Sequence, residues 1–166
     1  WIIADWNQVF VRSGSSEIRS LNPENGSTLY TKTFDSELRG FSPALADGRF
    51  FIPFYSANDD DPDIVAISAE DGRFLWSHEY DPGTVSDLAV ANGIVYFVGN
   101  NFVEDSKGVV ALDAASGSLV WSASLPDDGF AGGLAISAGT LFVGHYDSLD
   151  LFVPGMGKVF AFRNKR

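Results

Sequence analysis

Apolar residues in this chain come in short runs that glycine, asparagine and aspartate interrupt. Runs of this length fit strands, because a helix needs about ten or more residues without such breaks. The runs 64–67 and 109–112 are apolar at every position instead of alternating, which indicates strands that are covered on both faces. The pattern predicts an all-β protein without a helix.

Three pairs of turn residues separate neighbouring apolar runs: Asp47-Gly48, Asn92-Gly93 and Ala138-Gly139. Asn-Gly and Asp-Gly pairs accept the positive φ angles of a tight turn, so they are strong signals of a hairpin. A strand of small residues precedes each pair and an aromatic strand follows it. We expect each pair to join two antiparallel strands.

A phrase of twelve residues recurs three times, at 19–30, 65–76 and 110–121. Its turn glycines, Gly26, Gly72 and Gly117, are 46 and 45 residues apart. Such a period is typical of the four-stranded blades of β-propellers rather than of helical repeats. Each repeat is therefore predicted to form a four-stranded meander.

The predicted strands follow one order in every repeat, from the innermost to the outermost. The innermost are expected near 2–6, 41–46, 86–91 and 132–137, and the second near 8–12, 49–55, 94–99 and 140–145. The third are expected near 17–22, 63–68, 108–113 and 158–163, and the outermost near 28–33, 73–79 and 118–124. The fourth repeat lacks an outermost strand.

The predicted fold class is an all-β propeller segment of about four blades, the last of them incomplete. The chain, 1–166, is expected to be a single propeller domain or half-propeller, with blades at about 1–34, 35–80, 81–125 and 126–166. The chain holds fewer than four complete repeats, whereas closed propellers generally have about four to eight blades, so an open arc is expected. The alternative is a compact four-bladed ring in which another segment supplies the absent strand.

Two tryptophans end their copies of the phrase ten residues after an alanine: Trp76 follows Ala66, and Trp121 follows Ala111. The intervening turn places each pair on adjacent strands, where the small residue leaves room for the ring. An indole on an outer strand can cover the flank of the next blade, and its N–H needs a carbonyl partner. Both tryptophans are predicted to be structural rather than ligand-stacking residues.

The third copy reads Ala-x-Asp-x-x-Ser-Gly-x-x-x-Trp from Ala111 to Trp121 and resembles the tryptophan-docking repeat of pyrroloquinoline-quinone-type (quinoprotein-like) β-propellers. The earlier copies depart from this pattern at Ser68 and Asp71, and at Ser20, Asn25 and Tyr30. A fourth copy begins at Val159. The resemblance covers essentially the whole chain. It is specific for the fold but not for the function, because the family contains dehydrogenases, scaffolds and sensor domains alike.

Charge and composition exclude several classes of function. Twenty-two acidic residues against eleven basic ones give a net charge of −11, which would repel the phosphate backbone of a nucleic acid. The chain has no cysteine, and so no disulfide, thiolate nucleophile or cysteine-ligated metal. No apolar run approaches the ~18 residues of a membrane helix. An extracytoplasmic location, periplasmic, cell-surface or secreted, is expected from the family resemblance alone.

Many of the acidic residues fall in loops that the meander places on one face of the propeller. The predicted partner-binding residues are Asp59, Asp60, Asp61, Asp63, Glu104, Asp105, Asp127, Asp128, Asp147 and Asp150, and the same face receives Asp35, Glu37 and Asp81. We expect this face to be strongly negative and to attract a protein partner. The alternative is a set of solvated loops, because aspartate suits turns.

Candidate metal ligands occur in the densest acidic run, where Asp59, Asp61 and Asp63 alternate and would offer oxygen atoms to Ca²⁺. The run lacks the glycine and the distal glutamate of an EF-hand loop, and acidic runs are usually solvated. His78 and His145 have no motif around them, and each is expected to be an ordinary strand residue.

The sequence contains no nucleophile elbow, Walker loop or metalloprotease helix motif. For a dehydrogenase, the family resemblance implies pyrroloquinoline quinone with Ca²⁺ on the ring axis, and its alcohol-dehydrogenase branch implies adjacent cysteines, which this chain lacks. The preferred interpretation is a non-catalytic scaffold without a resident cofactor, which binds a protein partner or the remaining blades of its propeller. The alternatives are a fragment of such an alcohol or sugar dehydrogenase, and an extracellular domain that senses a ligand or polysaccharide through Phe130, Tyr146 and Phe152.

Overall fold

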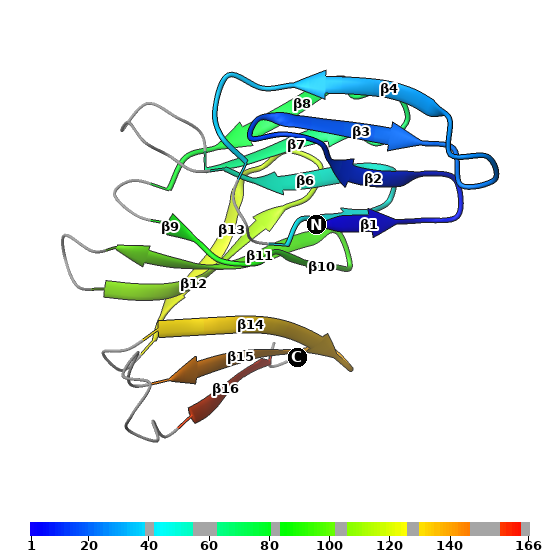
Figure 1. Cartoon of the computed structure of the whole chain (residues 1–166). Helices are drawn as coiled ribbons and strands as arrows, with labels where there is room; N and C mark the ends of the chain where they lie inside the picture. Colours follow the sequence, from blue (N-terminus) through cyan, green and yellow to red (C-terminus); the bar gives the residue numbers. More distant parts are fainter. Residues whose placement is uncertain are drawn as a thin grey trace, which may run out of the picture.

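The computed structural model describes residues 1–38, 42–54, 63–80, 84–101, 106–125, 130–146 and 157–163. Within these ranges the chain forms antiparallel strands in four sheets and no helix, and so contains no helix that could span a membrane. The sheets stack in the order of the sequence, with the first and the last at opposite ends (Figure 1). The prediction of an all-β propeller-type segment is confirmed.

Each sheet is a meander, and we call the sheets blades 1 to 4. Blade 1 contains β1 (Ile2–Ala4), β2 (Val9–Arg12), β3 (Glu17–Leu21) and β4 (Thr28–Thr33). Blade 2 contains β5 (Ala44–Ala46), β6 (Arg49–Pro53), β7 (Ile64–Ser68) and β8 (Phe74–His78). Blade 3 contains β10 (Ala89–Ala91), β11 (Ile94–Asn101), β12 (Ser106–Asp113) and β13 (Leu119–Ser124), and the short β9 (Thr84–Val85) also pairs with β11. Blade 4 contains β14 (Phe130–Ser137), β15 (Thr140–Tyr146) and β16 (Gly157–Arg163). The sequence pattern did not indicate β9.

The turns that join the first two strands of blades 2, 3 and 4 have the geometry predicted for them. Asp47, Asn92 and Ala138 have φ angles of 49°, 53° and 48°, and the glycine after each also has a positive φ. Two consecutive residues in this region make the tight hairpin turn that matches the twist of the strands. Ala138 is the least suited of the three, because alanine has no polar side chain to stabilise this conformation.

Three apolar clusters hold the blades together, one between each neighbouring pair. Between blades 1 and 2, the rings of Phe10 and Phe50 stack with centroids 4.5 Å apart. The strands β7 and β12 contribute to clusters on both of their faces, which explains why their apolar runs do not alternate. The hydrophobic core of this protein therefore lies between sheets and is not enclosed by any single one.

The outermost strands carry an aromatic residue at the same place in each complete blade. Its partner on the adjacent third strand is a small residue, and the pairs are Tyr30 with Ser20, Trp76 with Ala66 and Trp121 with Ala111. The register of the two strands shifts directly after each pair. The small residue leaves the space over which the ring extends toward the next blade.

Trp76 joins blade 2 to blade 3 and is only 7% exposed. Its indole Nε1–H donates a hydrogen bond to the carbonyl oxygen of Ala114 at 3.1 Å. Its ring lies against Gly117, where an added Cβ would be 2.7 Å from two ring carbons. Trp121 is half-buried instead and lies beside Phe162 of blade 4, with ring centroids 6.1 Å apart.

Tyr30 makes the corresponding contact between blades 1 and 2. Its hydroxyl donates a hydrogen bond to the carbonyl oxygen of Ala69 at 2.9 Å, and its ring lies against Gly72. Burial raises the pKa of Tyr30 to about 12, so the hydroxyl keeps its proton and donates at neutral pH. Tyrosine thus replaces tryptophan here without loss of the inter-blade hydrogen bond.

The departures of the second copy from the repeat pattern preserve a turn hydrogen bond. In blade 3 the Asp113 carboxylate accepts a hydrogen bond from the Ser116 hydroxyl at 2.9 Å. In blade 2 the two residue types exchange places, and the Ser68 hydroxyl donates to the Asp71 carboxylate, which lowers the pKa of that carboxyl. The exchange keeps both the donor and the acceptor, so the same turn forms.

Replacing Trp76 tests the contact between blades 2 and 3. We expect Trp76→Ala to lower the free energy of unfolding by about 3–5 kcal/mol, because it removes a buried ring. Trp76→Phe should cost about 1–2 kcal/mol, because the Ala114 carbonyl loses its donor. Urea unfolding measures both values. Trp121→Ala is the matched control, and a loss as large as that of Trp76→Ala would contradict the interpretation, because Trp121 is half-buried.

A pair of glycine substitutions separates backbone strain from collision with the ring. Gly117 and Gly139 have φ angles of 73° and 71°, but only at Gly117 would a Cβ meet a neighbouring atom within 4 Å. Gly139→Ala should cost about 1–2 kcal/mol of backbone strain. Gly117→Ala should cost at least about 1 kcal/mol more, because Trp76 must move. Equal losses in urea unfolding would show that the ring is not held against this turn.

Candidate protein-interaction surfaces

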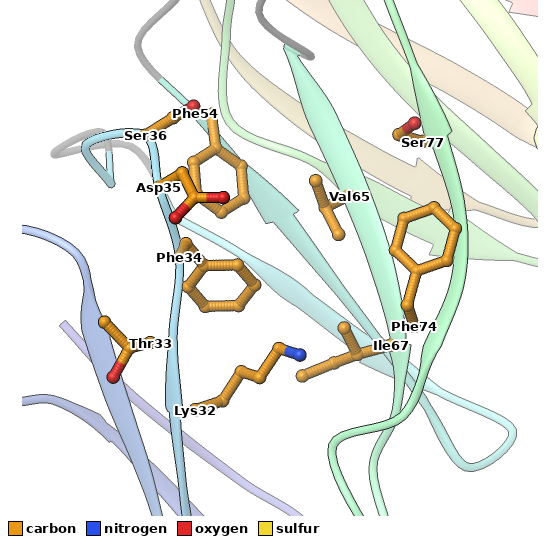
Figure 2. A pocket seen from close by; sticks show the side chains of 10 residues that line it. All are labelled: Lys32, Thr33, Phe34, Asp35, Ser36, Phe54, Val65, Ile67, Phe74 and Ser77. Carbon is orange, nitrogen blue, oxygen red and sulfur yellow. The ribbon is translucent and has the colours of Figure 1, made fainter.

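A crevice of about 320 Å³ lies between the outer parts of blades 1 and 2. Figure 2 shows side chains from Lys32 to Ser36 on one side and side chains of β7 and β8 on the other. Phe34 and Phe54 pack edge to face there, with ring centroids 4.9 Å apart. Phe74, which also lines the crevice, is 53% exposed.

The crevice is open because the side chains along β4 do not form a continuous row of rings. Alternate positions from the inter-blade tyrosine onward carry Tyr30, Lys32 and Phe34. In blade 2 the corresponding positions begin at Trp76, the partner of Ala66, and carry Trp76, His78 and Tyr80. The lysine thus stands where the next interface has a ring, and its slender side chain leaves part of the space unfilled.

The lining of the crevice suits an apolar or aromatic side chain of a partner. Its walls include Phe34, Phe54, Val65, Ile67 and Phe74, and its polar groups belong to Lys32, Asp35, Ser36 and Ser77. The Lys32 ammonium lies 5.9 Å from the centre of the Phe34 ring, within range of a cation–π contact. Apolar walls with a few polar groups are typical of binding sites, and a volume near the lower end of about 300–1,000 Å³ fits one or two side chains.

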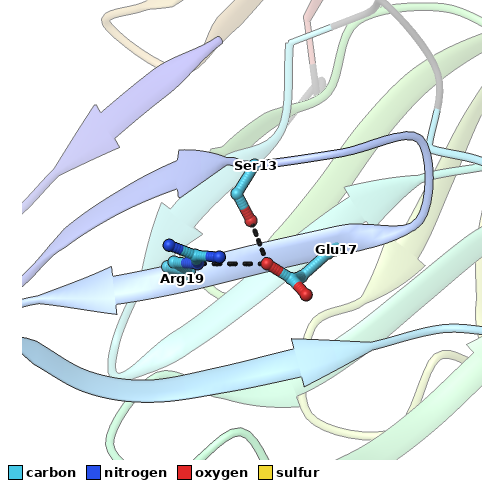
Figure 3. Close-up of polar contacts among 3 residues, drawn as sticks. All are labelled: Ser13, Glu17 and Arg19. Atoms are coloured by element: carbon cyan, nitrogen blue, oxygen red, sulfur yellow. Dashed lines mark hydrogen bonds and ion pairs between the residues drawn. The ribbon is translucent and has the colours of Figure 1, made fainter.

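A polar group of three residues lies on blade 1 (Figure 3). The Ser13 hydroxyl donates a hydrogen bond to Oε1 of Glu17 at 2.6 Å, and the Arg19 Nε–H donates to the same oxygen at 3.0 Å. The hydrogen bond from Ser13, followed by that from Arg19, lowers the pKa of the Glu17 carboxyl. The carboxylate therefore stays charged to a lower pH than an unpaired glutamate would.

The position of Arg19 explains why these charges occur there. Arg19 begins its copy of the repeat, as Val65 and Val110 begin theirs, and these valines are 6% and 4% exposed in clusters shared with the preceding blade. Among the described residues, no blade precedes blade 1. An arginine paired with Glu17 suits a face that no other sheet covers among the described residues.

The predicted acidic face lies largely outside the described residues. This applies to Asp59, Asp60, Asp61, Glu104, Asp105, Asp127, Asp128, Asp147 and Asp150, and to Asp81. Asp35 and Glu37 are described, and both are exposed. The partner-binding role of the acids and the calcium site at Asp59, Asp61 and Asp63 stay predictions.

Asp63 is not an exposed loop residue, contrary to the expectation from sequence, since it is only 2% exposed. Its Oδ2 accepts a hydrogen bond from the Tyr80 N–H at 2.7 Å. Its backbone N–H donates to the carbonyl of His78, and its own carbonyl accepts from Phe54. The residue thus extends the ladder of β7 and holds the chain after β8 in place. We correct its assignment: in this structure Asp63 is part of the blade and not of an exposed acidic surface.

The two histidines lie in strands, as expected, His78 on β8 and His145 on β15. His145 is buried and packs edge to face with Phe160, ring centroids 5.7 Å apart. No group of three or more His, Asp or Glu side chains within the described ranges is arranged to hold a metal ion. The aromatic side chains of Phe130, Tyr146 and Phe152, which the ligand-sensing alternative invokes, lie outside what the structure describes.

Comparison with protein families identifies the repeat. Residues 14–108 and 105–159 match the family model of a pyrroloquinoline-quinone-like repeat described as outer membrane protein assembly factor BamB. The chain belongs to this family. The resemblance seen in the tryptophan-docking phrase is thereby confirmed. No curated protein sequence matches the chain significantly.

Solved structures with a similar fold include one designed protein and two natural ones. The computationally designed Ika4 protein has a TM-score of 0.71 at 17% identity, over 96% of this chain and 88% of that chain. BamB from Moraxella catarrhalis has a TM-score of 0.61 at 15% identity, over 85% of this chain and 43% of that one. Kuenenia stuttgartiensis hydrazine synthase has a TM-score of 0.69 at 11% identity, over 95% and 48%. The chain spans less than half the length of these two natural chains, and at such identities the likeness establishes the fold alone.

The environment of His78 predicts a dependence of stability on pH. Burial lowers the pKa of His78 below its ordinary value of 6.5, and a hydrogen bond with the Gly117 backbone opposes this shift in part. As the pH falls below 6.5 the unfolded chain binds a proton before the folded chain does, so the free energy of unfolding should decrease until the lower folded pKa is passed.

Urea unfolding at pH 7.5 and pH 5.5 tests this expectation, with His78→Gln as the comparison. The wild-type chain should lose more stability between these pH values than the variant. Asp71 and Asp113 also have lowered pKa values. Their contribution to the free energy of unfolding is lost only at more acidic pH, where these carboxylates become protonated. An identical decrease in both proteins would contradict the role assigned to His78.

Proposed function

We propose that this chain is a non-catalytic propeller module that binds protein partners outside the cytoplasm. Membership of a family described by an outer membrane protein assembly factor supports both the interaction role and the location. The inter-blade contacts of Tyr30 and Trp76 give the module a fixed frame on which a partner-binding surface can be presented. In this role the tryptophan-docking phrase serves architecture and carries no chemistry of its own.

The observation that carries the proposal is the crevice between blades 1 and 2. Its floor contains the fully buried Phe54 and Ile67, while Phe74 remains exposed beside them. An exposed aromatic residue at a concave apolar site is typical of the centre of a protein interface. A partner that inserts an apolar side chain would cover Phe74 and fill the space beside Lys32.

The charge of the chain indicates which partners would be favoured. A net charge of −11, with Asp35 exposed beside the crevice, attracts a segment that carries basic residues next to its apolar side chain. The acidic residues predicted to bind the partner would contribute mainly to the rate of encounter, because rim charges act through long-range attraction. Asp63 is left out of this set because it is buried.

Site-specific photo-crosslinking from position 74 tests the crevice. Leu119 occupies the corresponding position on β13 and is also exposed, at 59% against 53% for Phe74, so it is the matched control. We expect a photoreactive residue at 74 to capture a defined partner in intact cells, and the same residue at 119 to capture it several-fold less. Equal capture from both positions, or none from 74, would exclude the crevice as the binding site.

Charge reversal at Asp59, Asp60 and Asp61 tests the electrostatic contribution. The triple substitution to lysine should reduce capture at low ionic strength and have a smaller effect at high ionic strength, because salt screens surface charges. Capture that is unchanged at low salt would remove these acids from the interface. Turnover of alcohols with pyrroloquinoline quinone and Ca²⁺, or binding on a glycan array, would instead support the dehydrogenase or the sensing alternative.

A further inference from the structure

The crevice between blades 1 and 2 is not the place of a missing strand. Its walls belong to two blades that each have all four strands, β1 to β4 and β5 to β8, so it lies between complete sheets (Figure 1). The residues that line it all belong to the described part of the chain. The chemistry of a partner that enters it can therefore be argued from these side chains.

Lys32 is the residue that keeps this space open. On β4 it lies opposite Ile18, which is fully buried in the cluster between blades 1 and 2. The corresponding residue of blade 2 is His78, which lies opposite the fully buried Ile64. The His78 ring packs edge to face with Phe97 of blade 3, with centroids 6.2 Å apart. The position that holds an aliphatic stem in one interface thus holds a ring in the next, so the space beside Lys32 suits a ring.

The Lys32 ammonium has few partners of its own. The side chain is half-buried, and Figure 2 shows it extending from β4 into the crevice, toward Ile67. Its nitrogen lies 5.9 Å from the centre of the Phe34 ring. In the described part of the chain it forms no ion pair, since the one ion pair there joins Arg19 to Glu17. A cation in this setting can attract either an anion or the face of a second ring.

The charge around the crevice favours the ring over the anion. Asp35 lines the crevice and is exposed, and the whole chain carries a net charge of −11. A carboxylate of a partner would be repelled by this charge. An aromatic ring is neutral as a whole, and the electron density of its face attracts an ammonium. Val65 and Phe74 on the opposite wall offer apolar surface to the rest of the ring.

We propose that the crevice accepts an aromatic side chain of the partner protein, and that Lys32 selects it by placing its ammonium against the face of the ring. The segment that carries the ring would have basic residues beside it, which Asp35 attracts. This inference rests on the proposed function, because it names the side chain that the crevice takes from the partner. Lys32 is then the residue that determines specificity, since it discriminates between an aromatic and an aliphatic side chain of similar size.

Two pentapeptides that differ only in the π electrons of one side chain provide the test. The first is Arg-Ser-Phe-Ser-Arg with blocked ends, and the second has cyclohexylalanine in place of phenylalanine. Cyclohexylalanine is similar in size and more apolar, so burial alone would make it bind at least as tightly. NMR titration of the isotope-labelled chain locates each peptide and measures its affinity. We expect both peptides to shift the signals of residues that line the crevice, and the phenylalanine peptide to bind about three- to tenfold more tightly.

Substitutions in the protein assign the preference to the ammonium. Lys32→Met keeps the length of the stem and removes the charge, so it should abolish the preference for phenylalanine, whereas Lys32→Arg should retain it. Arg49→Met is the matched control, because Arg49 is also half-buried and its loss changes the net charge equally, but it does not line the crevice. This control should keep the preference of the wild-type chain. Urea unfolding verifies that each variant is folded.

Several outcomes would overturn the proposal. They are absence of binding, signal changes confined to other parts of the chain, binding of the cyclohexylalanine peptide that is equal or tighter, and a preference that survives in Lys32→Met. A cross-link from position 74 into the chain itself would also overturn it, because the chain would then fill its own crevice. The proposed function fails by a different result, which is capture of a partner from position 74 that does not exceed capture from 119. Strong capture from 74 without a preference between the peptides would retain the surface and remove only the aromatic specificity.

Discussion

The contact between an aromatic ring on one blade and a glycine turn on the next is the interaction on which this structure depends. A four-stranded sheet of this size has two faces and cannot bury either by itself, so each blade is stable only against a neighbour. Trp76 and Tyr30 extend across that boundary. Trp76 donates a hydrogen bond to the carbonyl oxygen of Ala114, and its ring contacts Gly117. Tyr30 donates a hydrogen bond to the carbonyl oxygen of Ala69, and its ring contacts Gly72. The absence of a Cβ at the turn is what allows the close approach.

The same constraint explains the two ends of the stack. Blade 1 has a charged pair, Arg19 and Glu17, on a face where later blades carry buried valines. Blade 4 has the pattern of apolar residues of an internal blade, although its Val159 and Phe142 are exposed. The first end is therefore compatible with water, whereas the second still has the residues that pack against another sheet or strand.

Departures from the repeat have two kinds of consequence. Some are compensated locally. Blade 3 has the pair Asp113 and Ser116 and blade 2 has the reversed pair Ser68 and Asp71, so the turn hydrogen bond is kept. Tyrosine at position 30 likewise keeps a donor for the inter-blade hydrogen bond. Lys32 is not compensated in this way, because it stands where the next interface has a ring, and a crevice results. The crevice thus arises at a position where the repeat departs from the pattern of the next blade.

The sequence alone determined the strands, the hairpin turns and the stacking order, because these follow from local signals such as positive-φ residue pairs, apolar runs and a fixed repeat period. It also located Trp76 as an inter-blade residue. The burial of Asp63 could not be read from the pattern, because it depends on the path that the chain takes past Tyr80, 17 residues further along the sequence. The crevice at Lys32 was likewise beyond the pattern, because it is a gap between segments that meet only after folding. The period of a repeat specifies which strands lie side by side, whereas the spaces left between sheets depend on how whole sheets pack.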